Sequence, residues 1–289
     1  MSSLSQTKIL AKIFCLKQET ADDDEKHFRD FWGKVENCRV LKNDKENYTE
    51  YSEDGFVNEL TKLKKKCVKG SYECLVLAVS SHGWEKEHKD VEVSHEIVWK
   101  YKHSEKSFSL RDLLKIFDEK DFTDKKKIFL MQMCRHRSNE KTIAGKGEEH
   151  GVLFRSGTEP NVHTLGSNLI SPSKSAVSLT RDSDFCAGSP WPKTWKIPQL
   201  CIKNSVVLYS APSGYKSQST LYRLNDAGGW IYVCMNALKE RIKGQIISII
   251  DLFVMLNKEM SEKEENEYIG MSSFNHMLTE DIFIKLKKD

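Results

Sequence analysis

The sequence predicts an α/β fold in which a mostly parallel sheet is covered by helices on both faces. Short, continuous apolar runs recur along the chain, as in strands that are buried on both faces. Segments with helical periodicity separate these runs. Strands that alternate with helices in this way pair in parallel and require helices on both faces of the sheet. The 289 residues suit one large domain or two small ones.

The first half of the chain contains the clearest elements. Three aspartates, Asp22 to Asp24, favour the start of a helix because carboxylates stabilise a helix N-terminus. Further helices are expected at 53–68 and at 107–118, where Ser107 or Ser109 can cap the N-terminus. The strands expected in this half are 9–16, 38–41, 72–79 and 127–131, with a hairpin around 91–101.

The second half opens on a segment of different character. Residues 137–199 are rich in Gly, Ser, Pro, Asn and Asp and show no sustained periodicity. A segment this long without pattern is a functional loop, a linker or disorder. Regular pattern then returns, and the expected elements are a strand at 205–210, helices at 228–243 and 246–262, and a last strand at 281–286.

Composition excludes several classes of protein. The net charge of +3 is too small to indicate nucleic-acid binding, since the lysine runs are matched by acidic runs elsewhere. The eight cysteines are scattered and no two lie three apart, so we expect neither a metal site nor a redox pair, and no cofactor. No stretch approaches the roughly 20 apolar residues of a membrane span, and the first residues show no cleavage signal. We therefore expect no membrane association and a cytoplasmic location.

One thiol occupies a suggestive position. Residues 127–136, KIFLMQMCRH, begin as a buried strand and end in Cys134 and Arg135. A thiol beside a cation, where a strand meets solvent, is a plausible setting for a reactive thiolate. Taken alone, Cys134 fits an inert buried thiol better, because cysteine is among the most buried residue types.

A histidine in a matching position changes this interpretation. His82 and Gly83 follow the expected strand at 72–79, as Cys134 follows the strand at 127–131. If those two strands are neighbours, both side chains emerge at the carboxyl edge of the sheet, where function collects in such folds. His82 can then serve as acid and base for the thiol. The backbone N–H groups of Gly83 and Cys134 can stabilise an oxyanion.

These residues carry a family resemblance. The sequence Ser81-His82-Gly83, with Cys134 following His82 by 52 positions, resembles the two active-site motifs of caspases. The segments 196–198, 207–210, 214–215, 229–230 and 277–279 also match the family in order. The resemblance runs from residue 9 to residue 286, except for 137–195. It implies a caspase-like three-layer α/β/α fold with a mostly parallel six-stranded sheet.

The resemblance also implies roles for particular residues. Cys134 would be the nucleophile, His82 the general acid and base, and the Gly83 N–H a donor to the oxyanion. Gln132 and Arg223, which follows Tyr222, would bind the aspartate of the substrate. The family's second aspartate-binding arginine normally follows the first strand. Here only Lys17 is available.

Two further departures affect the motif itself. Met133 stands where the family has alanine, and His136 stands where it has glycine. A positive φ at that position would strain His136. The nucleophile and base are thus retained, whereas the substrate pocket is altered.

The resemblance finally implies a division of the chain and its partners. Residues 1–136 would form the large-subunit half, 137–195 the intersubunit linker and 196–289 the small-subunit half. Asp182 and Asp184 are the candidate processing sites in the linker. The implied function is an endopeptidase of proteolytic signalling or apoptosis that acts on protein substrates and dimerises through the edge strand of the small subunit. The alternative is a decoy of low or no activity that regulates an active caspase by heterodimerisation.

Overall fold

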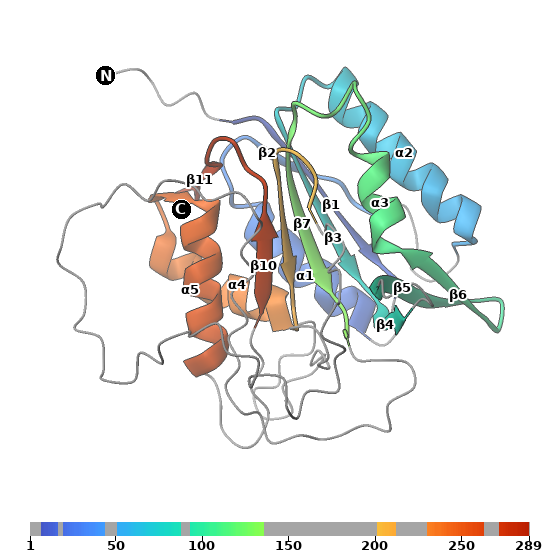
Figure 1. Cartoon of the computed structure of the whole chain (residues 1–289). Helices are drawn as coiled ribbons and strands as arrows, with labels where there is room; N and C mark the ends of the chain where they lie inside the picture. The colour runs from blue at the N-terminus through green and yellow to red at the C-terminus, as the bar shows by residue number, and fades with distance from the viewer. Residues whose placement is uncertain are drawn as a thin grey trace, which may run out of the picture.

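The computed structural model describes residues 7–16, 20–43, 51–87, 93–135, 201–211, 230–262 and 272–288. Within them a six-stranded sheet forms the centre of the molecule. Its strands are β1 (Ile9–Cys15), β2 (Cys38–Val40), β3 (Cys74–Ser80), β7 (Lys126–Gln132), β8 (Ser205–Tyr209) and β10 (Ser273–His276). They lie in the order β10-β8-β7-β3-β1-β2, and only β10 runs antiparallel to its neighbour (Figure 1). The predicted mostly parallel sheet is confirmed.

Helices cover both faces of this sheet, as predicted. The five helices of the described residues are α1 (Ala21–Trp32), α2 (Glu53–Lys69), α3 (Leu110–Ile116), α4 (Trp230–Ile242) and α5 (Ile249–Glu262). Figure 1 shows α2 and α3 on one side of the sheet and α1, α4 and α5 on the other. Two separate apolar clusters fill the spaces between the three layers.

The strand residues alternate between these two clusters. In β3, Val76 and Ala78 belong to the cluster under α1 and α4, whereas Leu75 and Leu77 belong to the cluster under α2. All seven residues of β3 are buried. A continuous apolar run is therefore required here, because successive side chains point to opposite faces and both faces are covered.

A separate antiparallel sheet follows β3 directly. It consists of β4 (His82–Glu87), β5 (Val93–Tyr101) and β6 (Ser104–Ser109) in the order β4-β5-β6. The sequence predicts only a hairpin around 91–101, so the strand that begins at His82 is an addition. Ser109 ends β6 and caps α3 by accepting from the Arg111 N–H at 3.2 Å. The expected helix at 107–118 is therefore shorter than its pattern indicates.

The C-terminal part differs from the expectation in two places. Ile246–Ser248, expected to open a helix, forms the short strand β9, and α5 begins at Ile249. The expected last strand is present as β11 (Phe283–Lys285), but it pairs antiparallel with β9 in a small sheet of its own. The sixth strand of the central sheet is instead β10, which the sequence pattern does not indicate.

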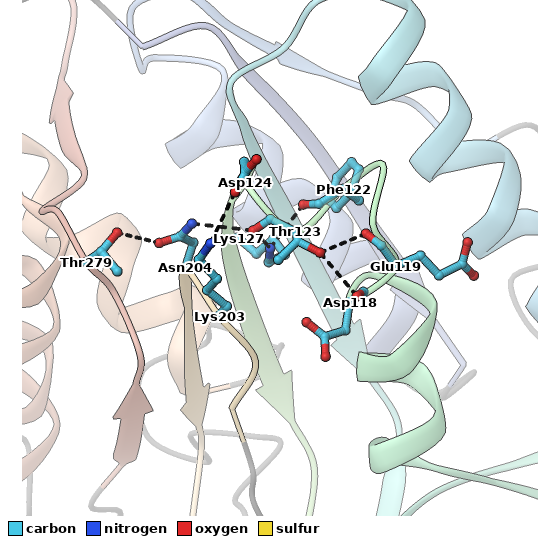
Figure 2. A network of polar contacts seen from close by, with 9 residues as sticks. All are labelled: Asp118, Glu119, Phe122, Thr123, Asp124, Lys127, Lys203, Asn204 and Thr279. Atoms are coloured by element: carbon cyan, nitrogen blue, oxygen red, sulfur yellow. Dashed lines mark hydrogen bonds and ion pairs between the residues drawn. The ribbon is translucent and has the colours of Figure 1, made fainter. Parts of the chain in front are cut away.

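Polar contacts join distant segments at the amino ends of β7 and β8 (Figure 2). The ammonium of Lys127 donates to the carbonyl oxygens of Phe122 at 3.2 Å and Thr123 at 3.1 Å. The Thr123 carbonyl also accepts from the side-chain amide of Asn204 at 3.4 Å. The Asn204 side-chain oxygen in turn accepts from the Thr279 hydroxyl at 2.6 Å. The loop before β7 is thereby tied to the segments before β8 and β11.

Lys127 is fully buried in this network. Burial lowers the pKa of its ammonium from 10.5 to about 8, although Asp118 and Asp124 act in the opposite direction. The two carbonyl oxygens supply the hydrogen bonds that a buried ammonium requires.

Candidate functional site

The strands that precede the predicted catalytic residues are neighbours. β3 and β7 pair in parallel, and Ser80 at the end of β3 lies opposite Gln132 at the end of β7. The Ser81 N–H donates to the Gln132 carbonyl at 3.1 Å, which extends the pairing by one residue. His82 and Cys134 each follow these partners by two positions. Both therefore emerge at the same carboxyl edge of the sheet.

Gly83 lies directly against the end of β7. A Cβ atom added at Gly83 would lie 2.8 Å from the carbonyl oxygen of Cys134 and 3.1 Å from the Cβ of Met133. It would also lie 3.1 Å from the Glu96 carbonyl oxygen. Real side chains do not tolerate the shortest of these separations, so only glycine allows the two segments to approach this closely.

The backbone around His82 is fixed by the antiparallel sheet. His82 lies opposite Val98 of β5, and the Ser81 hydroxyl donates to the Val98 carbonyl at 2.6 Å. The preceding residue, Ser80, ends β3, and its hydroxyl donates to the buried carboxylate of Asp24 in the first turn of α1. The histidine thus stands on a rigid element. Its side chain is exposed, and that of Cys134 is half-buried.

Gln132 is held by the first turn of α4. It is the last residue of β7, and its side chain is buried. Its side-chain oxygen accepts from the Ile231 N–H in the first turn of α4 at 3.1 Å. This bond satisfies one of the N–H groups that a helix N-terminus leaves without an intrahelical partner.

Met133 is accommodated by the core rather than by the site. Its side chain is buried in the apolar cluster under α2 and α3. The Ser210 hydroxyl accepts from the Met133 N–H at 3.1 Å and lies 3.3 Å from the Met133 carbonyl oxygen. The larger side chain at this position is therefore part of the apolar core.

Arg135 turns its guanidinium into the interior. Its Nε lies 3.3 Å from the carboxylate of Glu85, and both side chains are buried. The guanidinium carbon stands 4.3 Å from the ring centroid of Tyr209. One Nη atom donates to the Ser273 hydroxyl at 3.2 Å and to the Ala211 carbonyl at 3.4 Å. The cation next to Cys134 is thus neutralised within the protein.

His95 completes this buried cluster. Its Nε2 lies 3.3 Å from an Nη atom of Arg135 and 3.2 Å from the Glu85 carboxylate. Burial, with a contribution from the Arg135 charge, holds the pKa of His95 well below 6.5. We refer to Glu85, His95, Arg135 and Tyr209 as the arginine cluster. This cluster joins β4, β5 and β8 to the residue after Cys134. The sequence pattern singles out neither Glu85 nor His95, so the cluster is recognised only from the structure.

Comparison with known proteins identifies the family. A model of the caspase domain matches residues 25–283. The chain belongs to the caspase family. A similar solved structure is the crystal structure of caspase-1 from Spodoptera frugiperda, with 13% sequence identity and a TM-score of 0.54. The match covers 98% of this chain and 90% of that chain, and at this identity it shows the shared fold. No curated protein matches the sequence significantly.

Several residues that the caspase resemblance singles out lie outside the described part of the chain. These are Lys17, His136, Asp182, Asp184, Tyr222 and Arg223. The chain between Leu16, where β1 has ended, and the start of α1 at Ala21 contains no arginine. The second aspartate-binding arginine of the family therefore has no counterpart in this connection.

Two other features are absent from the part of the chain that the structure describes. Within the described ranges, no three His, Cys, Asp or Glu side chains are grouped so that they could hold a metal ion. No helix among the same residues is long and apolar enough to cross a membrane.

Proposed function

We propose that this protein is a caspase-like cysteine endopeptidase that cleaves after aspartate and acts in proteolytic signalling or apoptosis in the cytoplasm. The observation that carries the proposal is the approach of Gly83 to Cys134. The sheet register and the missing Cβ at Gly83 bring the segment that carries His82 against the segment that carries the thiol. This is the arrangement that a thiol nucleophile, its base and an oxyanion donor require.

The chemistry follows from these groups. His82 takes the proton of the Cys134 thiol. The thiolate sulfur then attacks the main-chain carbonyl carbon of the substrate aspartate. The N–H groups of Gly83 and Cys134 donate to the resulting oxyanion. His82 then returns the proton to the leaving amine, and a thioester remains. Water, deprotonated by His82, attacks the thioester and releases the new carboxylate and the thiol.

Activation of the thiol is assigned to His82 rather than to Arg135. Glu85 pairs with the Arg135 guanidinium in the interior, so the field of that cation at Cys134 is reduced. His82, in contrast, is exposed and stands on the strand that packs against the end of β7. A histidine can exchange protons near neutral pH, which a guanidinium cannot.

Recognition of aspartate is proposed to be weaker than in the rest of the family. Gln132 and Arg223, with Tyr222 beside it, would bind the substrate carboxylate. The family's second arginine is replaced at best by Lys17, which offers no bidentate fork. Hydrogen bonds to a charged group contribute roughly 1.5–3 kcal/mol each. The loss of one arginine therefore makes the free energy of aspartate binding less favourable by a few kcal/mol.

Processing and assembly are proposed on the same basis. Residues 137–195 would be the linker between the subunits, cleaved after Asp182 or Asp184. In the described part of the chain β10 pairs with β8 on one side only, and Phe274 in its middle is half-buried. An edge strand of this kind can pair with a second copy or with a related caspase.

A decoy that regulates another caspase is the second candidate function. The bond from the Ile231 N–H to the Gln132 side chain favours it, because a substrate-binding residue is engaged within the protein. The absence of an arginine after the first strand and the histidine at position 136 also favour the decoy function. In this case the chain would bind an active caspase through the β10 edge and change its rate.

One experiment separates the two functions. The wild-type protein and the Cys134→Ala variant are assayed on tetrapeptide substrates that end in aspartate, before and after cleavage of the linker. The peptidase proposal predicts turnover by the wild type alone. Absence of turnover by both proteins would exclude it. The decoy function then requires that co-expression with an active caspase yields a complex or alters the rate of that caspase.

A further inference from the structure

The outer edge of β2 presents open main-chain groups. β2 is the last strand of the central sheet and, within the described residues, pairs only with β1. The Ile9 N–H donates to the Asn37 carbonyl at 3.0 Å, and the Leu41 N–H donates to the Ala11 carbonyl at 2.8 Å. Alternate residues of a strand face opposite neighbours. The N–H and C=O of Val40 are therefore directed away from β1.

A basic groove lies beside this edge on the face that α2 covers. It is an open hollow of about 530 Å³ that extends from β2 to the C-terminal half of α2. Arg39 reaches it because it lies opposite Leu10, whose side chain packs under α2. The groove is lined by Arg39, Lys62, Lys65, Lys66, Lys69, Gly70 and Tyr72.

The charge of this groove is not balanced by the residues around it. Lys62 pairs with Glu59 at 2.6 Å. Arg39, Lys65, Lys66 and Lys69 are exposed, and no acidic side chain of the described residues pairs with them. The chain as a whole has a net charge of only +3. Four unpaired cations in one groove are thus a local feature, and they fit a ligand with several negative charges.

A second hollow lies on the opposite face of the same edge. It measures about 580 Å³, and its lining includes Val40 of β2 together with residues of α1. Its charged lining residues have both signs: Asp22, Glu25 and Asp30 are acidic, and Lys26, Arg29 and Lys42 are basic. A strand added to β2 would therefore direct alternate side chains into a basic groove and into a hollow of mixed charge.

We propose that the β2 edge binds an extended segment of a partner protein that carries an acidic residue at every second position. The main-chain groups of the segment would pair with those of Val40, and its acidic side chains would enter the basic groove. A nucleic acid could use the cations but not the strand edge, so the open edge favours a protein partner. The site is independent of catalysis, because Arg39 and Tyr72 lie near the amino ends of the strands, whereas His82 and Cys134 lie beyond the carboxyl ends.

The test uses the full-length Cys134→Ala protein, which cannot cleave a bound segment. Binding of a fluorescein-labelled peptide of alternating glutamate and threonine is measured by fluorescence anisotropy. A block peptide of the same composition, with all glutamates before all threonines, controls for charge. The proposal predicts that the alternating peptide binds about tenfold more tightly, and that methylation of its main-chain N–H groups removes this advantage.

Protein variants test the two parts of the site separately. Lys65→Glu combined with Lys69→Glu is expected to weaken binding about tenfold, whereas Lys100→Glu with Lys120→Glu, an equal change of charge on exposed residues elsewhere, is expected to have little effect. Val40→Pro removes one outward N–H, which an edge strand tolerates, and is expected to weaken binding about fivefold.

Four results would overturn the proposal. Equal binding of the alternating and block peptides, or equal losses in both charge-reversal variants, would mean attraction by charge alone. Absence of binding would mean that the basic side chains only protect the edge from aggregation. Tight binding of a single-stranded oligonucleotide that Val40→Pro leaves unchanged would assign the groove to nucleic acid.

Discussion

Gly83 and Cys134 are in such close contact that a single methyl group would separate them. A Cβ at Gly83 would meet the Cys134 carbonyl oxygen at 2.8 Å, in a region where the Met133 side chain and the Glu96 carbonyl leave no space for it to move. Cys134 and the strand that carries His82 are therefore positioned by direct contact, rather than by a flexible loop.

Gly83→Ala is expected to displace the end of β7 and to reduce the rate at which Cys134 reacts with iodoacetamide by about tenfold or more. The free energy of unfolding should fall by about 1–3 kcal/mol, the range observed for overpacking. Labelling followed by mass spectrometry measures the first effect and urea denaturation the second. Gly55→Ala is the control, because its added Cβ meets only the Ser52 hydroxyl at 3.1 Å and the edge of a ring. An unchanged labelling rate in Gly83→Ala would show that this contact does not position the thiol.

Glu85→Gln should destabilise the protein strongly, since it leaves the buried Arg135 guanidinium without its counterion. Breaking a buried pair by removal of one partner costs about 3–5 kcal/mol. Glu36→Gln, which removes the partner of the less buried Lys285, is expected to have a much smaller effect. Urea denaturation of both variants checks the comparison. Similar losses in the two variants would mean that the arginine cluster contributes no more than a surface pair.

The same cluster makes stability depend on pH through His95. Its pKa in the folded state is held well below 6.5 by burial, so below pH 6.5 the unfolded chain binds a proton that the folded chain does not. Stability is thus lost as the pH falls from about 7 toward 5. His95→Asn should flatten this part of the profile, which is followed by urea denaturation at a series of pH values. Parallel profiles for the two proteins would exclude His95 as the source.

Lys127 makes the stability of the protein depend on pH in the alkaline range. Its pKa is lowered from 10.5 to about 8 by burial, so between these values the unfolded chain binds the additional proton and a rise in pH favours the folded state. Cysteines with raised pKa values, such as Cys38 and Cys201, act in the opposite direction. The contribution of Lys127 is therefore the difference between the wild type and Lys127→Met. That difference should grow in favour of the wild type from pH 8 to 10.5, and a constant difference would contradict the lowered pKa.

The sequence predicts the central sheet well because its strands are continuous apolar runs buried on both faces. The predicted helix start is wrong at Ile246–Ser248. These three residues continue the apolar pattern of α5, but they form a strand that pairs with β11. The sequence also misses β10, because an edge strand of four residues that includes Ser273, Asn275 and His276 carries little apolar signal.

The candidate site shows the same division. His82, Gly83 and Cys134 can be found from the sequence, because they follow recognisable strands and match family motifs. The pairing of Arg135 with Glu85 and His95 cannot, since it depends on how β4 and β5 pack against the ends of β7 and β8. The burial of Met133 is likewise a consequence of packing that the motif comparison does not contain.

The most direct test of the proposed peptidase is covalent trapping of its nucleophile. The wild-type protein and His82→Ala are incubated at neutral pH with a short peptide fluoromethyl ketone that ends in aspartate, and adducts are located by mass spectrometry. A catalytic pair predicts one adduct, on Cys134, that forms about a hundredfold or more faster in the wild type than in His82→Ala. The same reagent ending in asparagine should react more slowly. No adduct on Cys134, or equal rates in the wild type and His82→Ala, would contradict the assignment of His82 and Cys134 as a catalytic pair.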